Sequence, residues 1–169
     1  MRTNNIIRFL LSRKVAFEVL ESEPVKRSAV ESAERLGVDP RMVYKSIVLK
    51  RAERGKPIVV VIPGPASVDL KKVAALLGEK KLFMTTQSEA EKLTGMLSGG
   101  ISPLGLLHKR FSFVVDASAA EAPAMILSGG ERGLSVRLRG RDLIDLIQPA
   151  VGWVTAEGAL MNESPDDGA

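Results

Sequence analysis

Residues 43–62 read VYKSIVLKRAERGKPIVVVI and carry the strongest fold signal in the sequence. Val43–Leu49 and Ile58–Ile62 both have the length and apolar content of a strand, and the polar turn Glu53–Lys56 lies between them. Two such runs joined by a short turn that contains glycine are typical of a β-hairpin. The second run is apolar throughout, which is the pattern of a strand buried on both faces. We therefore predict a hairpin whose second strand is covered on both sides.

Further helices and strands are indicated on both sides of this hairpin. Ser28 and Glu31 have the spacing of a capping box and Gly37 is a typical terminator, which predicts a helix over Ala29–Leu36. The same kinds of signal predict four more helices, at Thr3–Arg13, Asp69–Leu77, Ser88–Leu93 and Arg141–Ile147. They predict five more strands, at Val15–Leu20, Leu82–Met84, Phe111–Val115, Ala124–Leu127 and Leu134–Leu138.

This order of elements favours a mixed α/β fold. Helices and strands are interspersed, but several strands are joined by tight turns and not by helices. We therefore expect a mixed sheet or a partly closed barrel with outer helices, and not a doubly wound parallel sheet.

The length and composition suit one domain. A chain of 169 residues with 45 % hydrophobic residues is long enough to bury a full core. We expect this domain to span residues 1–155 and residues 156–169 to be a disordered tail, because the tail offers little to bury. The apolar stretch Ile6–Leu11 is interrupted by Arg8 and is too short to cross a membrane. We expect a cytoplasmic protein without membrane association.

The inventory of reactive side chains argues against several kinds of catalysis. The sequence has no cysteine, which excludes disulfides, thiolate metal ligands and a cysteine nucleophile. Its single histidine, His108, lies in the basic stretch Leu107–Arg110, where we expect a surface position and not a serine–histidine–acid triad. One histidine without cysteine also argues against a catalytic zinc site. We therefore expect neither a metal nor a cofactor.

The charge balance is basic. Lysine and arginine outnumber aspartate and glutamate by 24 to 20, which gives a formal net charge of +4. This charge permits a polyanionic partner such as a nucleic acid but does not require one. Basic residues that could contact phosphates include Lys71, Lys72, Lys80, Lys81, Lys109 and Arg110. The alternative is that they are only solvated surface charge.

Lys45 is the first candidate functional residue. In the strand predicted at Val43–Leu49 it falls on the same face as Val43, Ile47 and Leu49, because side chains alternate with a period of two. A lysine on an apolar face must reach a polar cavity or carry a perturbed charge. Lys45 therefore marks a candidate site. The alternatives are a charge that protects the end of the strand and a face that is not buried.

Two glycine-rich segments could bring backbone amides close to a ligand. Residues 97–105, LSGGISPLG, contain paired glycines, whose amides can cradle an anion or a developing oxyanion, and a stiffening proline. This segment lacks the Gly-Lys-Ser/Thr ending of a P-loop and is not a dinucleotide fingerprint. The alternative is a long turn that uses glycine for its shape. Residues 128–133, SGGERG, read by themselves as an ordinary hairpin connection.

Several short segments spread along the chain form a set with a characteristic order and spacing. They are Leu36–Pro40, Val43–Ser46, Val68–Ala74, Leu77–Lys81, Thr94–Gly95, Gly99–Gly105, Val115–Asp116 and Ser128–Leu134. In this order they resemble the YbaK/EbsC family, also called the prolyl-tRNA synthetase editing-domain superfamily. The resemblance covers the chain from about the N-terminus to Ile147.

The resemblance implies a fold and an activity. Members of this family share a curved mixed sheet approaching a barrel, with helices around it. They clear amino acids wrongly attached to tRNA, either as domains of prolyl-tRNA synthetase or as free proteins acting in trans. The Gly-Gly-Ile-Ser-Pro form of the loop is most similar to the branch that removes cysteine from proline tRNA. The expected function is an aminoacyl-tRNA deacylase that acts on Cys-tRNA(Pro), with prolyl-tRNA synthetase as a candidate partner. The alternative is a non-catalytic module of the same fold that binds tRNA or a synthetase.

The resemblance also implies a site. The essential lysine of the family corresponds to Lys45, and the glycine whose backbone contacts the substrate carbonyl corresponds to Gly99. The residues expected to be catalytic are Lys45, Gly99 and Gly100, and those expected to contact substrate are Ser46, Ser102, Pro103, Ser128 and Gly129. Residues 20–24, LESEP, lack the tyrosine or histidine cluster usual in the cysteine-clearing branch, so this part of the pocket is expected to differ. An aminoacyl ester is already activated, and its hydrolysis needs a positioned water and donors for the carbonyl oxygen, not a covalent nucleophile.

Overall fold

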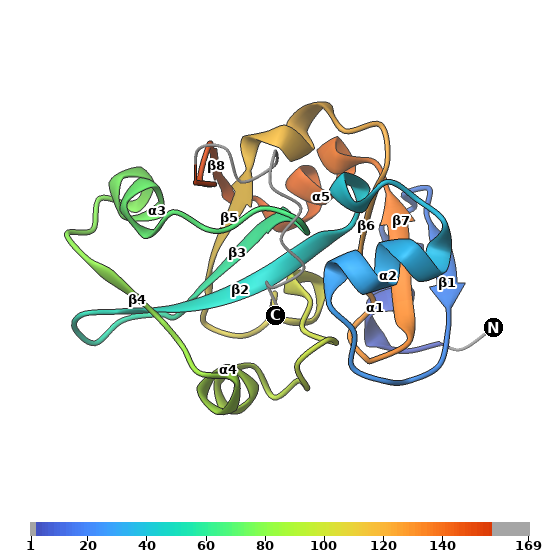
Figure 1. The fold of residues 1–169 in the computed structure, drawn as a ribbon, viewed down its shortest axis with the longest axis horizontal. Coiled ribbons are helices and arrows are strands. Elements are labelled where there is room, and N and C mark those ends of the chain that lie inside the picture. The colour runs from blue at the N-terminus through green and yellow to red at the C-terminus, as the bar shows by residue number, and fades with distance from the viewer. Residues whose placement is uncertain (1–2, 157–169) are drawn as a thin grey trace.

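The strands form two open sheets, and helices surround both (Figure 1). The computed structural model describes residues 3–156. Its helices are α1 (Asn5–Ser12), α2 (Ala29–Leu36), α3 (Leu70–Leu77), α4 (Gln87–Thr94) and α5 (Gly140–Ile147). Its strands are β1 (Glu18–Glu21), β2 (Tyr44–Arg51), β3 (Ile58–Pro63), β4 (Leu82–Met84), β5 (Ser112–Asp116), β6 (Met125–Ser128), β7 (Leu134–Leu138) and β8 (Ala150–Gly152). The segment expected to be a tail, 156–169, lies outside the described residues apart from Ala156.

The predicted hairpin is confirmed and lies at the centre of the larger sheet. β2 and β3 pair antiparallel, with Lys45 opposite Ile62, and β3 is buried along its whole length. β4 pairs with the other edge of β2, while β5 and then β8 extend the sheet in parallel, which gives the order β4-β2-β3-β5-β8. The apolar sequence of β3 follows from this position, because both of its faces are covered.

The smaller sheet has the order β1-β7-β6 and is antiparallel throughout. One parallel bridge between Val43 and Ile126 connects β6 to the chain just before β2. Among the described residues β1 and β6 are the end strands of the smaller sheet, and β4 and β8 are those of the larger one. The mixed α/β fold is therefore confirmed, but the near-closure into a barrel is not, because the strands do not form one continuous ring.

Local capping signals place the helix ends close to where the sequence predicts them. Ser28 and Glu31 make both hydrogen bonds of the predicted capping box, and Gly37 ends α2 in the left-handed conformation. α4 begins at Gln87, one residue earlier than expected, because Thr86 and Glu89 form a second capping box.

Most strand bounds lie within two residues of the prediction, but two strands differ more. β1 begins at Glu18, three residues later than expected, because its partner β7 pairs only with Glu18–Glu21. β8 was not predicted. Its three residues directly follow Pro149 and form a strand only through parallel pairing with the end of β5, a partner that the local sequence does not reveal.

Two apolar clusters cover the two faces of the larger sheet. One includes residues of α1 and α5, and the other packs against α3. Ile47 and Leu49 belong to the cluster beneath α3, so Lys45 shares their face, as the period of two predicts. Val43 instead packs in a third, smaller cluster with α2 and β6.

Asp116 is a buried carboxylate that joins the end of β5 to the chain that follows β8. Its side-chain oxygens accept hydrogen bonds from the Val154 N–H at 3.0 Å and from the Ser118 N–H at 3.2 Å. We expect Asp116→Ala to lower the free energy of unfolding by about 2 kcal/mol, because it leaves a buried N–H without an acceptor. Thermal unfolding measures this as a fall in Tm of about 4–8 °C.

The control for this prediction is Asp39→Ala. Asp39 also accepts a hydrogen bond from a backbone N–H, that of Arg41 at 2.9 Å, but it lies at the surface. Its loss should therefore lower Tm less than the loss of Asp116. Equal shifts for the two variants would contradict the role assigned to burial.

Candidate functional site

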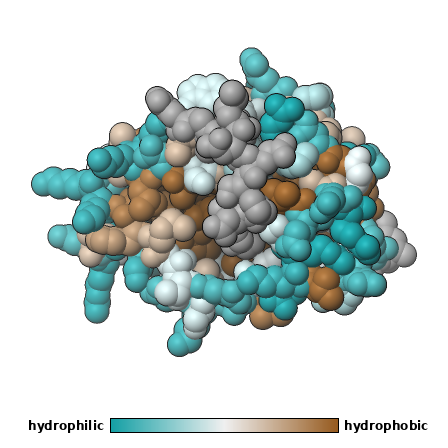
Figure 2. Space-filling view, viewed as in Figure 1, coloured by the Kyte–Doolittle hydropathy of each residue, from teal (hydrophilic) through white to brown (hydrophobic). Residues whose placement is uncertain are grey.

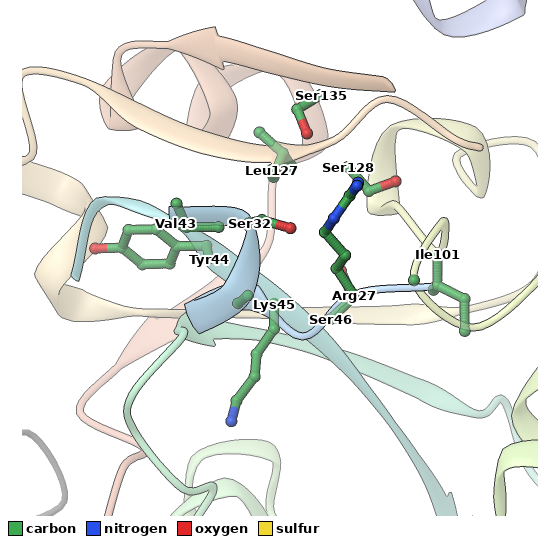
Figure 3. Close-up of a pocket in the computed structure, with 12 residues that line it drawn as sticks. Arg27, Ser32, Val43, Tyr44, Lys45, Ser46, Ile101, Leu127, Ser128 and Ser135 are labelled. Atoms are coloured by element: carbon green, nitrogen blue, oxygen red, sulfur yellow. The ribbon is translucent and has the colours of Figure 1, made fainter. Parts of the chain in front are cut away.

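A small pocket opens where the two sheets meet, at the start of β2 (Figure 3). Its volume is about 50 Å³. The lining comes from the start of α2, the start of β2, the β6–β7 hairpin and the loop after α4. The lining residues are Arg27, Ala29, Ser32, Val43, Tyr44, Lys45, Ser46, Gly99, Ile101, Leu127, Ser128 and Ser135.

Strand pairing explains why hydroxyl groups gather on one side of this pocket. Ser128 and Ser135 are directly opposite each other in the β6–β7 pair, so their side chains lie on the same face of the smaller sheet. α2 packs near this face through the cluster that contains Ala33 and Ile126. This packing adds the hydroxyl of Ser32 to those of Ser128 and Ser135.

Lys45 lines the pocket from β2 and is only 6 % exposed. Its side chain runs away from the group formed by Arg27 and Ser128 (Figure 3). The ammonium and guanidinium groups therefore lie at different ends of the set of lining residues.

Gly99, in the loop after α4, lines the edge of the pocket. Gly99 has φ +90°, and within the described part of the chain its N–H makes no hydrogen bond. The residues on either side are fixed, because the Gly100 N–H donates to the Leu97 carbonyl at 2.8 Å and the Ser98 N–H donates to Glu91 Oε2 at 2.8 Å. The Arg132 Nε–H also donates to the Ser98 carbonyl at 2.8 Å. The loop therefore holds one main-chain donor that has no partner within residues 3–156, and such a donor is one requirement of an oxyanion site.

The structure brings four of the eight expected site residues into this pocket: Lys45, Ser46, Gly99 and Ser128. The other four, Gly100, Ser102, Pro103 and Gly129, lie outside the lining set and shape the loops. The Ser102 side chain is fully buried and accepts a hydrogen bond from the Leu104 N–H at 3.3 Å, at the start of the short 3₁₀ turn Pro103–Gly105. The Gly129 N–H donates to the Leu134 carbonyl at 2.8 Å and closes the β6–β7 turn.

Gly100 has a packing role that the sequence did not indicate. A Cβ at this position would lie 3.0 Å from the Glu131 Cα and 3.1 Å from the Arg132 nitrogen. The 99–100 loop and the 128–133 turn therefore press backbone against backbone. The Asn4 side chain, which caps α1, fixes the same turn by donating to the Gly129 carbonyl at 2.9 Å.

Three polar lining residues were not predicted: Arg27, Ser32 and Ser135. Ser135 had a weak signal, because the sequence LSVRL of β7 alternates polar and apolar residues and so marks a polar face. No sequence signal marked Arg27 or Ser32, because their approach to the pocket depends on how α2 packs.

Arg27 gives the pocket a fixed positive charge. Its side chain is 13 % exposed, and NH1 donates to the Glu23 carbonyl at 3.0 Å and to Ser22 Oγ at 3.2 Å. Its nearest carboxylate is that of Glu23, 3.8 Å away and largely exposed. The lining residues include two cations, Arg27 and Lys45, and no carboxylate. The pocket therefore favours a group that becomes negative during a reaction.

Tyr44 borders the pocket but directs its hydroxyl elsewhere (Figure 3). The hydroxyl lies 2.9 Å from Ser118 Oγ. Burial raises the pKa of Tyr44, and the nearby Asp116 carboxylate raises it further, while the Ser118 hydrogen bond lowers it. Tyr44 is therefore a neutral wall of the pocket near pH 7.

The other predicted candidates lie apart from this pocket. His108 is exposed, as expected, and borders a separate hollow beside α1. Lys72 Nζ and Lys109 Nζ donate to the carbonyls of Thr155 and Thr94, both at 2.9 Å, and so are held by the protein itself. Across residues 3–156 no three histidine, aspartate or glutamate side chains are grouped to hold a metal ion. In the same range no helix has the length and apolar content needed to cross a membrane.

Comparisons of the sequence with known proteins agree with one another. The profile of the aminoacyl-tRNA editing domain matches residues 23–146. EbsC of Enterococcus faecalis, a suggested Cys-tRNA(Pro)/Cys-tRNA(Cys) deacylase, is 33 % identical over 156 residues, which cover 90 % of this chain and 93 % of EbsC. The prolyl-tRNA editing protein ProX of Acetoanaerobium sticklandii is 24 % identical over 61 % of this chain and 62 % of its own. The proline–tRNA ligase of Limosilactobacillus fermentum is 32 % identical over 51 % of this chain but only 16 % of the ligase.

Two solved structures have a similar fold. A hypothetical protein matches with a TM-score of 0.82 at 23 % identity, over 90 % of this chain and 100 % of its own. A protein suggested to be a trans-editing enzyme for prolyl-tRNA synthetase matches with a TM-score of 0.75 at 24 % identity, over 92 % of this chain and 99 % of its own. Both likenesses support the mixed α/β architecture.

Proposed function

The chain belongs to the aminoacyl-tRNA editing domain family, and from this we propose that it is a trans-editing hydrolase, which cleaves the ester between a wrongly attached amino acid and tRNA. The match to EbsC extends over almost the whole of both chains, whereas the matched part of the ligase is a small fraction of that protein. The proposed activity therefore follows EbsC, whose match covers almost all of both proteins.

The Gly99 amide is the observation that carries this proposal. It borders a pocket with two cationic side chains and makes no hydrogen bond within residues 3–156. An N–H in this position can bind the ester carbonyl, and the bond strengthens as the oxygen becomes negative in the tetrahedral intermediate. The oxygen of a water molecule forms the new bond to the carbonyl carbon. The bond from that carbon to the ribose oxygen then breaks, and the ribose oxygen takes up the proton that the attacking water gives up.

The residues divide between chemistry and support. Gly99 binds the developing oxyanion and Lys45 stabilises its charge, while Ser46 and Ser128 contact the aminoacyl group. Gly100, Ser102, Pro103 and Gly129 act through the shape of the two loops that form the pocket.

The size and lining of the pocket favour a small amino acid. Its volume of about 50 Å³ suits a short side chain, and Ser32, Ser128 and Ser135 offer hydroxyls to a polar one. Cysteine attached to proline tRNA is therefore the proposed substrate, and the synthetase that makes this error, prolyl-tRNA synthetase, is the proposed partner. A cytoplasmic location follows from a tRNA substrate.

A deacylation panel tests this function. Purified protein is mixed with tRNAs charged with cysteine, alanine, serine or proline, and the release of each amino acid is followed with time. We expect fastest release from Cys-tRNA(Pro). Binding of these tRNAs without release of any amino acid would overturn the hydrolase proposal and favour a non-catalytic tRNA-binding module.

Deacylation is expected to persist when metal ions are chelated. The proposed chemistry uses an amide, two cationic side chains and water, and none of these steps needs a metal. The measurement compares rates with and without EDTA, using tRNA folded beforehand in magnesium. A loss of activity that zinc restores would contradict this expectation. If magnesium restores activity, structure probing of the tRNA is the control. Magnesium then acts on the tRNA if EDTA also unfolds the tRNA.

A further inference from the structure

Charge is divided unevenly between two parts of the chain. All 24 lysine and arginine residues precede residue 157, and so do 16 of the 20 acidic residues. Residues 157–169, EGALMNESPDDGA, hold the other four carboxylates, and we call them the acidic segment. The formal side-chain charge is therefore +8 for residues 1–156 and −4 for the acidic segment. Parts of one molecule with opposite charge attract each other.

The last residue that the structure describes lies close to the pocket. The Ala156 N–H donates to the Ser67 carbonyl at 2.9 Å. Ser67 comes three residues after Gly64, whose N–H donates to the carbonyl of the pocket residue Val43 at 2.7 Å. Three residues span at most about 11 Å, so the acidic segment is joined to the chain a short distance from the pocket.

The chain that leads to the acidic segment packs on the side of the larger sheet that Lys45 faces. Val154 is buried in the apolar cluster beneath α3, which also contains Ile47 and Leu49. Lys45 shares the strand face of Ile47 and Leu49, because side chains alternate along β2. Glu157, the first acidic residue of the segment, comes only three residues after Val154. The acidic segment is therefore joined to the chain on the same side of the sheet as Lys45.

Cationic side chains gather in and around the pocket. Arg27 and Lys45 line it, and no carboxylate does. Two more approach beside Gly99, where an added Cβ would lie 3.6 Å from the Lys26 Cγ and 3.7 Å from the Arg132 Cγ. Within residues 3–156 neither Lys26 nor Arg132 makes an ion pair. The pocket and its edge therefore favour an anionic group.

One face of the molecule is apolar in one region and hydrophilic around it. β2 crosses between α3 and α4 (Figure 1), and apolar side chains gather there, with hydrophilic side chains around them (Figure 2). The acidic segment has the apolar residues Leu160 and Met161 between Glu157 and Glu163. Its composition therefore suits both parts of this face.

We propose that the acidic segment binds the cationic side chains at the pocket, chiefly Lys45, and that tRNA must displace it to reach the site. The displacement by tRNA rests on the proposed deacylase function. A segment tethered this close has an effective concentration in the mM range, so weak ion pairs are enough to hold it there. A tRNA carries many phosphates and can displace the segment, whereas a small anion makes too few contacts.

Two variants of the whole chain separate binding at the pocket from a general change in charge. In each variant four carboxylates become amides, which raises the formal net charge from +4 to +8. The segment variant changes the four carboxylates of the acidic segment: Glu157→Gln, Glu163→Gln, Asp166→Asn and Asp167→Asn. The control variant changes four exposed carboxylates that do not line the pocket and make no ion pair within residues 3–156: Glu34→Gln, Glu53→Gln, Glu121→Gln and Asp145→Asn.

Binding of uncharged tRNA is measured by fluorescence anisotropy at one salt concentration. We expect the segment variant to bind at least about tenfold more tightly than the control variant, although their net charges are equal. In ¹⁵N NMR spectra without tRNA, the amide signals of Ser46, Gly99 and Ser128 should move in the segment variant and stay in place in the control variant. Equal affinities of the two variants, including no binding by either, would overturn the proposal. Unchanged pocket signals in the segment variant would do the same.

Lys45→Met tests whether the segment binds the pocket through this lysine. In a Lys45→Met background the segment substitutions should cause smaller signal changes, because one partner of the interaction is already lost. Signal changes of the same size as in wild type would overturn the role given to Lys45.

These spectra require no turnover, so this proposal and the proposed function can fail separately. If the pocket signals move but no charged tRNA releases its amino acid, the segment binds the pocket and the hydrolase function is lost. If tRNA is deacylated while the pocket signals stay in place in the segment variant, the hydrolase function stands and the role of the acidic segment is lost.

Discussion

Lys45→Ala is expected to reduce single-turnover deacylation at least about 100-fold while the protein stays folded. The pocket has two cationic side chains and no lining carboxylate, and the ester oxygen becomes negative beside them. Lys45 approaches from a different end of the site than Arg27 (Figure 3), so Arg27 cannot replace it. Removing Lys45 therefore leaves one side of the developing charge uncompensated. Single-turnover release of cysteine from charged tRNA measures the effect.

Two further variants make this prediction decisive. Lys45→Met keeps most of the side-chain volume and removes the charge, which guards against a folding defect in the alanine variant. Lys50→Ala makes the same truncation on the same strand, where the lysine is exposed and paired with Glu89 at 2.6 Å. It should leave the rate unchanged. If Lys45→Met retains activity within about threefold of wild type, a barrier change of less than 0.7 kcal/mol, Lys45 has no part in the mechanism.

Gly99→Ala is expected to lower the deacylation rate by about 10²–10³, the usual effect of losing one oxyanion donor. A Cβ at Gly99 would meet Lys26 and Arg132 atoms at 3.6–3.7 Å, which is ordinary contact and not a clash. The expected loss of activity comes instead from the backbone, because Gly99 has φ +90°, where alanine is strained. The alanine variant should rotate its backbone to remove this strain. That rotation turns the amide away from the substrate carbonyl. Single-turnover kinetics and thermal unfolding are measured on the same preparation.

Gly78→Ala separates the cost of backbone strain from the loss of the donor. Gly78 ends α3 with φ +73°, far in the sequence from the pocket residues, and a Cβ there would meet nothing within 4 Å. Both variants should lose stability by about 1 kcal/mol. Only Gly99→Ala should lose turnover. Equal stability losses with normal turnover in both would remove the oxyanion role from Gly99.

Elements with strong local signals could be predicted closely from the sequence. The capping residues Ser28 and Glu31 and the terminator Gly37 fix α2 through contacts within a few residues, and the structure matches them. β8 lacks such a signal, because its existence depends on a partner strand more than thirty residues earlier, where Val114 pairs with Ala150. The number and closure of the sheets depend in the same way on distant pairings, and this is why a curved sheet approaching a barrel was expected where two open sheets meet at one bridge.

The site was predictable to the extent that single residues carry their own signal. A lysine on an apolar strand face and a paired glycine in a loop are visible in the sequence, and the structure places Lys45 and Gly99 at one pocket. Arg27 and Ser32 are ordinary residues at the start of a helix and become part of the site only because α2 lies near the β6–β7 hairpin. The Gly100 N–H donates to the Leu97 carbonyl, whereas the Gly99 N–H has no hydrogen-bond partner within residues 3–156. The path of the main chain decides this difference, and the residue type does not specify that path.

The pairing of β1 with β7 limits how this protein can be shortened or transplanted. The family match begins at residue 23, but β1 ends at Glu21, and the Asn4 side chain fixes the turn next to the pocket. A fragment cut at the match boundary would expose the edge of β7 along Leu134–Arg137. An open strand edge is a template for pairing with other chains, so such a fragment would tend to aggregate. A graft into another protein should therefore begin before α1 and retain Thr155, which bridges to Val68.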